Sequence, residues 1–176
     1  MQLARYFSAV VLTALTACSM KVVRVDMDAA RLGAAQTASP RAVPLGCAYR
    51  LGGIVDARPN GSGAGGLGEY AFQFADAAGI VRQQLLAAGL QGTGDQAPMV
   101  DVRIMQLYLA QNLGTKTPVA VYQVALAGHP SFLLRSQKPT ANWNGTQNEA
   151  YAAYARVLAD VNQQLVGRLN TYCATD

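Results

Sequence analysis

The sequence predicts an α+β fold, a two-layer sandwich in which a mostly antiparallel sheet carries two helices on one face. Two long segments, 71–88 and 147–170, place their apolar residues on one helical face. Four shorter segments have the alternating or β-branched apolar pattern of strands, and they lie at 49–57, 100–109, 119–127 and 132–136. The order is therefore β-α-β-β-β-α, and one face of the sheet offers both helices an apolar surface to cover.

Glycines mark several positions in the first half of the predicted domain. Gly52-Gly53 permits a bulge in the first strand, 49–57. The next segment, 60–68, reads NGSGAGGLG and is expected to be a flexible loop. After the helix at 71–88, Gly89 is placed to cap it in the left-handed conformation. If the strands on either side of this helix are parallel, their connection is a right-handed crossover.

The second half contains two local signals. Alternation in the second strand changes phase at Leu107, which indicates either a bulge near Met105-Gln106 or burial of both faces. Thr146 and Glu149 have the spacing of a capping box, so the long helix is expected to begin there.

The N-terminus has the pattern of a targeting segment. Arg5 precedes an apolar run of about ten residues, too short to cross a hydrocarbon core of ~30 Å and typical of a signal peptide. The run ends in LTAC, residues 15–18, which resembles the bacterial lipobox. The resemblance implies cleavage before Cys18, a diacylglycerol on its thiol and an acyl chain on its amine, and two or more chains give stable anchoring. A plain secretory signal or a buried N-terminal helix would be the alternatives. Ser19 favours the outer membrane.

The predicted organisation is a signal peptide at 1–17, lipidated Cys18 and a tether at 18–46, and a periplasmic domain at 47–176. A short strand is possible within the tether at 22–27, where apolar and charged residues alternate. With Cys18 lipidated, Cys47 and Cys173 form an even pair in an oxidising compartment, which predicts a disulfide. Two separately buried thiols are the alternative.

Composition and motifs argue against several classes of function. A chain with 51% apolar and 14% charged residues is not disordered, and a net charge of +4 spread along it predicts no nucleic-acid partner. Gly61–Gly66 matches G-x-G-x-x-G, but the helix that follows begins several residues too late and no acidic residue ends the second strand, as a nucleotide site requires. His129 is the single histidine, so no metal site is expected. Asp56 and Asp76 could meet as an acid–base pair, but capping or pairing with Arg is commoner. We expect no enzyme activity and no cofactor besides the lipid on Cys18.

Two regions are candidates for contact with a partner. One is the glycine-rich segment, represented by Gly63 and Leu67. The other is an aromatic group at the start of the last helix, represented by Trp143 and Tyr151, since Trp and Tyr dominate interaction hot spots. The alternatives are a loop without a partner and ordinary packing of the helix.

The mature sequence also resembles the YajG-type putative lipoproteins over about residues 48–126. The matching features are Gly53–Pro59 (GIVDARP), Leu67-Gly68, the helix end Leu86–Leu90 and the strand start Val100–Val102. Auxiliary lipoproteins of lipid-trafficking ABC systems are related small α/β proteins. The resemblance implies an outer-membrane-anchored, periplasm-facing, non-catalytic protein.

These observations lead to one main hypothesis of function. It is a non-catalytic binding or scaffolding module for an envelope complex or the cell wall. The alternative is an accessory lipoprotein of a lipid or solute ABC transport system. A hydrolase that depends on Asp56 ranks last.

Overall fold

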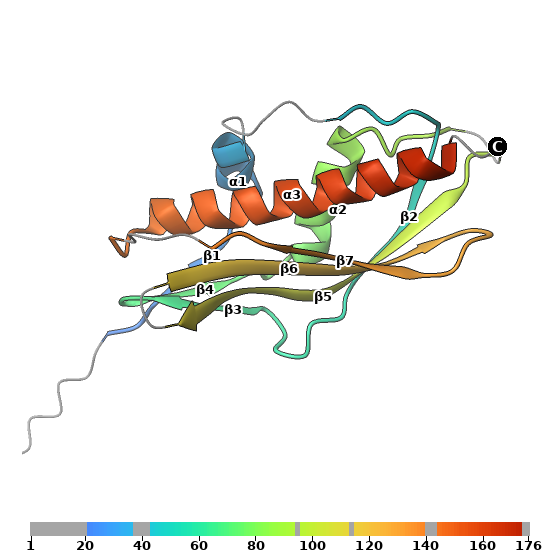
Figure 1. Ribbon diagram of the computed structural model, residues 1–176. Helices are drawn as coiled ribbons and strands as arrows, with labels where there is room; N and C mark the ends of the chain where they lie inside the picture. Colours follow the sequence, from blue (N-terminus) through green and yellow to red (C-terminus); the bar gives the residue numbers. More distant parts are fainter. Residues whose placement is uncertain (1–20, 37–42, 94–95, 113–114, 140–143, 174–176) are drawn as a thin grey trace, which may run out of the picture.

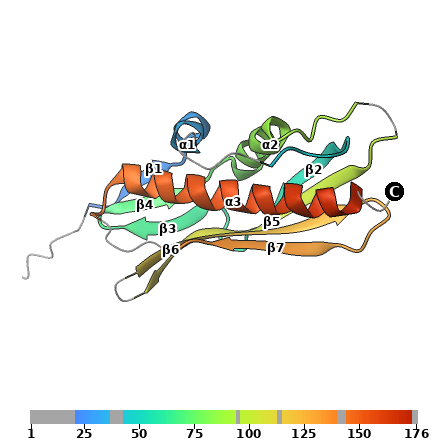
Figure 2. The same cartoon turned by 45° about the horizontal axis from the view of Figure 1, so that its top comes forward.

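The protein is an α+β sandwich, as predicted (Figure 1). The computed structural model describes residues 21–36, 43–93, 96–112, 115–139 and 144–173. Within these ranges two sheets form one layer and three helices form the other. Figures 1 and 2 agree that the helices lie on the same side of the sheets.

The larger sheet has the strand order β2-β5-β6-β7. Its strands are β2 (Arg50–Asp56), β5 (Met99–Asn112), β6 (Thr115–Leu126) and β7 (Phe132–Gln137). The pair β2 and β5 is parallel, and the other two pairs are antiparallel.

Both predicted bulges occur in this sheet. The register of β2 against β5 shifts between Leu51 and Ile54, at the two glycines. The register of β5 against β6 shifts between Ile104 and Gln106, which leaves Met105 as the extra residue. The shift keeps Ile104 and Leu107 both in the core, and this explains the change of phase in the sequence.

The smaller sheet has the order β1-β4-β3 and was mostly missed by the sequence analysis. Its strands are β1 (Val23–Asp26), β3 (Gly63–Leu67) and β4 (Tyr70–Gln73). The β1–β4 pair is parallel and the β3–β4 pair is antiparallel.

The three helices are α1 (Ala29–Gln36), α2 (Ala77–Ala87) and α3 (Gln147–Cys173). The capping box at the start of α3 is present: the Thr146 hydroxyl accepts from the Glu149 amide at 3.3 Å, and the Glu149 carboxylate accepts from the Thr146 amide at 3.0 Å. Gly89 follows α2 with a φ of 104°, as expected for a left-handed cap.

The helix expected at 71–88 is shorter than predicted. It begins at Ala77, because the carboxylate of Asp76 caps it by accepting from the Gly79 amide at 2.8 Å. The residues before it form β4, in which Phe72 is buried, and Phe74 two residues later is also buried. Phe74 fits a helical stripe as well as a strand alternation, so the pattern alone did not separate the two structures.

The glycine-rich segment is a strand rather than a flexible loop. Ala64 and Leu67 of β3 are buried at 0% and 2% exposure. Gly65 has a φ of 97°, and a Cβ on it would stand 2.9 Å from the carbonyl oxygen of Leu109 in β5. Glycine is therefore needed where β3 approaches β5.

The segment predicted to be a tether is corrected over its described part. The short strand expected at 22–27 exists as β1, and α1 follows it. Val25, Met27 and Leu32 are buried in the same core as the rest of the domain. The folded domain therefore begins near residue 23 rather than 47.

Replacing Leu32 tests whether α1 belongs to the domain. Leu32 is 0% exposed, so Leu32→Ala is expected to lower the free energy of unfolding by about 2–5 kcal/mol in urea denaturation. The matched control is Gly33→Ala on the same helix, where the added Cβ meets nothing within 4 Å. It is expected to be neutral or to stabilise by up to about 1 kcal/mol. If both variants behave like wild type, α1 does not contribute to the fold.

Candidate functional site

The predicted contact residues differ in their exposure to solvent. Gly63 is exposed, whereas Leu67 is 2% and Tyr151 is 4% exposed. Cys18 and Trp143 lie outside the described residues. The expectation that Leu67 and Tyr151 contact a partner is therefore corrected, because both belong to the interior.

Tyr151 has a structural role that explains its burial. Its hydroxyl donates to the carbonyl of Asp26 at 3.1 Å and accepts from the amide of Asp28 at 3.2 Å. The guanidinium of Arg31 covers its ring at 3.9 Å from the centroid. Tyr151 thus fastens α3 to the turn between β1 and α1.

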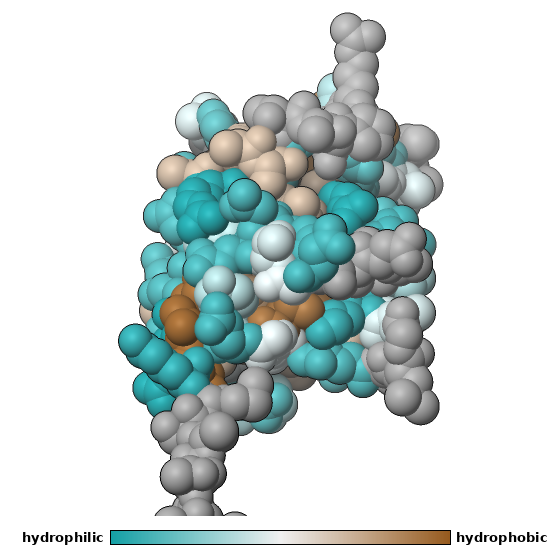
Figure 3. All heavy atoms as spheres, turned by 90° about the vertical axis from the view of Figure 1, so that its left-hand side faces the viewer, coloured by the Kyte–Doolittle hydropathy of each residue, from teal (hydrophilic) through white to brown (hydrophobic). Residues whose placement is uncertain are grey.

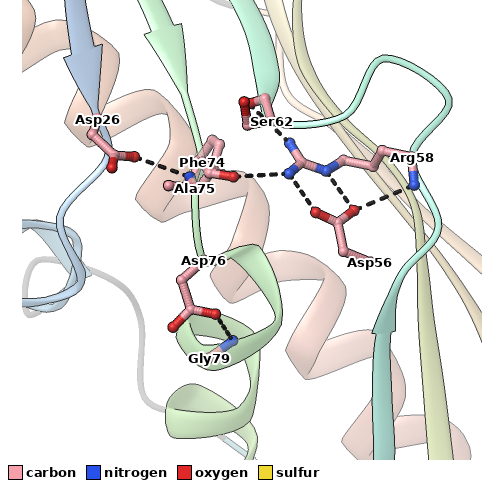
Figure 4. A network of polar contacts seen from close by, with 8 residues as sticks. All are labelled: Asp26, Asp56, Arg58, Ser62, Phe74, Ala75, Asp76 and Gly79. Carbon is pink, nitrogen blue, oxygen red and sulfur yellow. Dashed lines mark hydrogen bonds and ion pairs between the residues drawn. The ribbon is translucent and has the colours of Figure 1, made fainter.

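An ion pair between buried Arg58 and more exposed Asp56 fixes the loop after β2 (Figure 4). Arg58 is 8% exposed. Its Nε and Nη2 donate to the two carboxylate oxygens of Asp56 at 2.7 and 2.6 Å, and Nη2 also donates to the Phe74 carbonyl at 3.0 Å. This hydrogen bonding to Arg58 holds the pKa of Asp56 below its usual value. The pair joins the end of β2 to the chain that leaves β4.

The two aspartates considered as an acid–base pair have separate partners in Figure 4. Asp56 is held by Arg58, and Asp76 caps α2 through the Gly79 amide. Each carboxylate therefore has a structural role, pairing with Arg or capping a helix, which was the commoner alternative to an acid–base pair.

A small cavity lies between this loop and β5. Its volume is about 200 Å³, which is below the ~300–1,000 Å³ of typical ligand pockets. Gln106, beside the bulge, contributes a buried Oε1 that has no hydrogen-bond partner among the described residues. This oxygen could accept a hydrogen bond from a small polar group. The lining residues are Arg58, Pro59, Asn60, Gly63, Met105, Gln106, Leu107 and Tyr108.

The glycine match that resembles a nucleotide fingerprint overlaps β3. Gly63 pairs with Gln73 and Gly66 pairs with Ala71 across the β3–β4 ladder. In a dinucleotide site the glycines form the turn that leads directly into a helix. Here β4 separates them from α2, so the arrangement differs from that site.

A surface group of rings was missed by the sequence analysis. The His129 ring centroid lies 4.3 Å from that of Tyr172, and Phe132 lies 6.3 Å from Tyr172. The guanidinium of Arg168 lies 5.6 Å from the Phe132 ring and 5.4 Å from the Tyr172 ring. We call these four residues the ring cluster. Arg168 and Tyr172 are four residues apart on α3, which was the available signal. Their partners come from the turn between β6 and β7 and from the first residue of β7. Within the described ranges, no three His, Cys, Asp or Glu residues are placed so that they could hold a metal ion.

Cys47 and Cys173 are joined by a disulfide, consistent with the pairing inferred from the sequence. Their Cα atoms are 5.8 Å apart, within the usual range for such bonds, although 126 residues separate them. Closing so long a loop stabilises the fold by ~4–5 kcal/mol in the chain-entropy model.

Hydrogen bonds hold the same two segments together beside the disulfide. The Tyr49 hydroxyl donates to the Leu169 carbonyl at 2.9 Å. The Asn170 side chain accepts from the Gly46 amide at 2.7 Å and donates to the Pro44 carbonyl at 2.9 Å. The end of α3 is therefore tied to the chain before β2 by several groups.

Comparison with known proteins gives similar structures but no relative in sequence. No family model matches the chain, and no curated protein matches it. The fold is similar to a DUF330 protein from Xanthomonas campestris (11% identity, TM-score 0.49, 78% of this chain and 93% of that one). It is also similar to a minor lipoprotein from Acinetobacter baumannii (15%, 0.40, 70% and 92%) and to rare lipoprotein B from Shewanella oneidensis (11%, 0.31, 70% and 95%). With TM-scores below 0.5, the function has to be argued from the chain itself.

None of the described helices is both long and apolar enough to cross a bilayer.

The Asp56–Arg58 pair predicts a pH-dependent contribution to stability. A carboxylate with a lowered native pKa stabilises the fold above its unfolded pKa and loses that effect as pH falls through the native value. Asp56→Asn is therefore expected to lower the free energy of unfolding at neutral pH by about 1–3 kcal/mol. The gap from wild type should narrow below the ordinary value of 3.8. Urea denaturation across pH measures it, with Glu69→Gln, an exposed carboxylate, as the control. A gap that stays constant in acid would contradict this role.

Proposed function

We propose that the protein is a lipoprotein, anchored through Cys18 and facing the periplasm, whose domain is a non-catalytic binding module for an envelope complex. The observation that carries the proposal is the sequence LTAC at 15–18, which ends a short apolar run and is followed closely by the folded chain at β1. A diacylglycerol and an N-acyl chain on one residue would hold the domain stably at a membrane. Ser19 supports the outer membrane as its location.

The roles of the carboxylates support binding rather than catalysis. Asp56 pairs with Arg58, Asp76 caps α2 and Glu149 caps α3. Asp160 accepts from the Ser136 hydroxyl at 2.6 Å and pairs with Lys138 at 2.9 Å. Each of these groups has a structural partner that accounts for its position.

The cavity beside β5 does not suit an apolar ligand. About 200 Å³ beside a guanidinium and two side-chain amides is small and polar for a lipid. In the alternative function, an accessory lipoprotein of an ABC transport system, the domain would then act by docking on another subunit.

The ring cluster is the surface that we assign to the partner. His129 and Arg168 are exposed, and Phe132 and Tyr172 are half-buried. Tyr and Arg are enriched in interaction hot spots, and Tyr buries a large area with little loss of rotamer freedom.

Mass measurement tests the anchor. Protein extracted from membranes is expected to begin at Cys18 and to carry the added mass of a diacylglycerol and a third acyl chain. Cys18→Ser is expected to carry no lipid and to leave the membrane fraction. An intact mass without fatty acids, or a chain beginning elsewhere, would overturn the proposal.

Cross-linking in living cells tests the partner surface. A photo-reactive amino acid in place of His129 is expected to give a specific adduct with one envelope protein. The same amino acid at Ala30, an exposed position on α1, is the control and is expected to give none. Arg168→Ala or Tyr172→Ala should reduce the yield at position 129 by several fold. Equal labelling at both positions would count against the ring cluster as the binding surface.

A further inference from the structure

We infer that the end of the domain at which β1 begins rests on the lipid headgroups of the membrane that holds Cys18, with the disulfide end directed away from it. The inference deepens the proposed function and depends on lipidation of Cys18. It follows from the length of chain between the anchor and the fold, and from the charges at that end.

The connection between anchor and fold is short. Val23, the first residue of β1, is five residues after Cys18. Five residues span at most about 18 Å even when fully extended. Val23 is fixed in the domain, because its amide donates to the carbonyl of Glu69 at 2.8 Å and it pairs with Tyr70. The start of β1 therefore cannot lie far from the bilayer surface.

Other elements meet at the same end of the molecule. The turn between β3 and β4 lies beside the start of β1 through the contact of Val23 with Glu69. The tip of the β5–β6 ladder joins it, because the Gln111 side chain donates to the carbonyl of Gly66 and Gln111 pairs with Lys116. In Figures 1 and 2 the first residues of α3 lie at this end as well. We call this surface the proximal end.

The opposite end is distant from it along α3. This helix has 27 residues and is therefore about 40 Å long. Its last residue, Cys173, carries the disulfide, and Tyr172 belongs to the ring cluster. Figure 1 shows the β6–β7 turn at this far end too.

The proximal end has the charge and polarity of a surface that touches headgroups without inserting. Three cations lie at this end, exposed Lys21 and Arg24 and half-buried Lys116. Two carboxylates oppose them, Glu69 beside β1 and Glu149 in the first turn of α3. Figure 3 views the molecule from this end, and hydrophilic residues dominate its coloured surface with smaller apolar patches between them. Val22, 62% exposed, adds one apolar side chain next to the anchor. Lys and Arg near an anionic leaflet are attracted to it, so the three cations pull this end toward the membrane.

Fluorescence quenching tests the orientation in the full-length lipidated protein. An environment-sensitive probe is attached to Glu69→Cys at the proximal end or to Ala127→Cys at the far end, both exposed. The protein is reconstituted in vesicles of phosphatidylethanolamine and phosphatidylglycerol that contain a lipid with a nitroxide on its headgroup. Quenching at position 69 is expected to exceed that at 127 by several fold. A nitroxide deep in the acyl chains should quench neither probe.

Two variants test the reasons for the orientation. A long Gly-Ser linker inserted between Met20 and Lys21 removes the length restriction and should reduce the difference in quenching between the two positions. Arg24→Glu with Lys116→Glu should weaken quenching at 69 in vesicles with phosphatidylglycerol. The same charge change at Arg103, exposed on β5, is the control and should leave it unchanged.

The outcomes separate this inference from the proposed function. A sample whose intact mass lacks acyl chains would overturn the lipid anchor. A fully acylated sample with equal quenching at 69 and 127, or stronger quenching at 127, would overturn the orientation and leave the anchor in place.

Discussion

The packing of α3 is the constraint on which the other elements depend. Near its start Tyr154 packs edge-on against Phe72 and Phe74, with ring centroids 6.2 and 5.1 Å away, and its hydroxyl donates to the Ala64 carbonyl of β3. The apolar residues that follow cover β6 and β7 of the larger sheet. At its end Cys173 is bonded to Cys47. One helix therefore holds the smaller sheet, the larger sheet and the chain before β2, and its 27 residues set the length of the domain. Burial raises the pKa of Tyr154 far above its usual value, as expected for a hydroxyl enclosed in the core.

The parts of the fold that the sequence could predict are those with a long period or a specific local signal. The stripe of α3 repeats over seven turns, and the capping box and the β5 bulge each leave a mark in the residues themselves. Apart from the alternation that predicted β1, the smaller sheet leaves no such mark. Its strands have four or five residues, and β3 is GAGGL, a composition that is depleted in strands. What makes GAGGL a strand is its position between β4 and β5, where the space at Gly65 admits no side chain. That reason exists only once the chain is folded.

The features of the candidate site also differ in how far the sequence could predict them. Counting cysteines was enough to propose the pair at 47 and 173. Lipidation of Cys18 leaves these two as the remaining cysteines, and the inferred compartment is oxidising. Residue type could not say whether an aromatic residue is in the core or on the surface, so Tyr151 was taken for a contact residue although its hydroxyl is occupied by β1 and the following turn. The ring cluster went unnoticed for the opposite reason. His129 looked like an isolated turn residue, and only the end of α3 brings Tyr172 and Arg168 beside it.

The early start of the fold changes what an anchored domain can do. A tether of some thirty residues would let the domain search a hemisphere of ~30 Å root-mean-square radius around its anchor, since a flexible chain extends by ~5–6 Å times the square root of its length. With β1 and α1 packed in the core, most of that freedom is gone, because Val25 and Leu32 cannot leave the domain without exposing apolar surface. On the proposed anchor, the domain would hold its far end at a nearly constant height above the membrane. A partner that presents its own site at that height would meet it at a high effective concentration, and one whose site lies much higher or lower would not meet it at all.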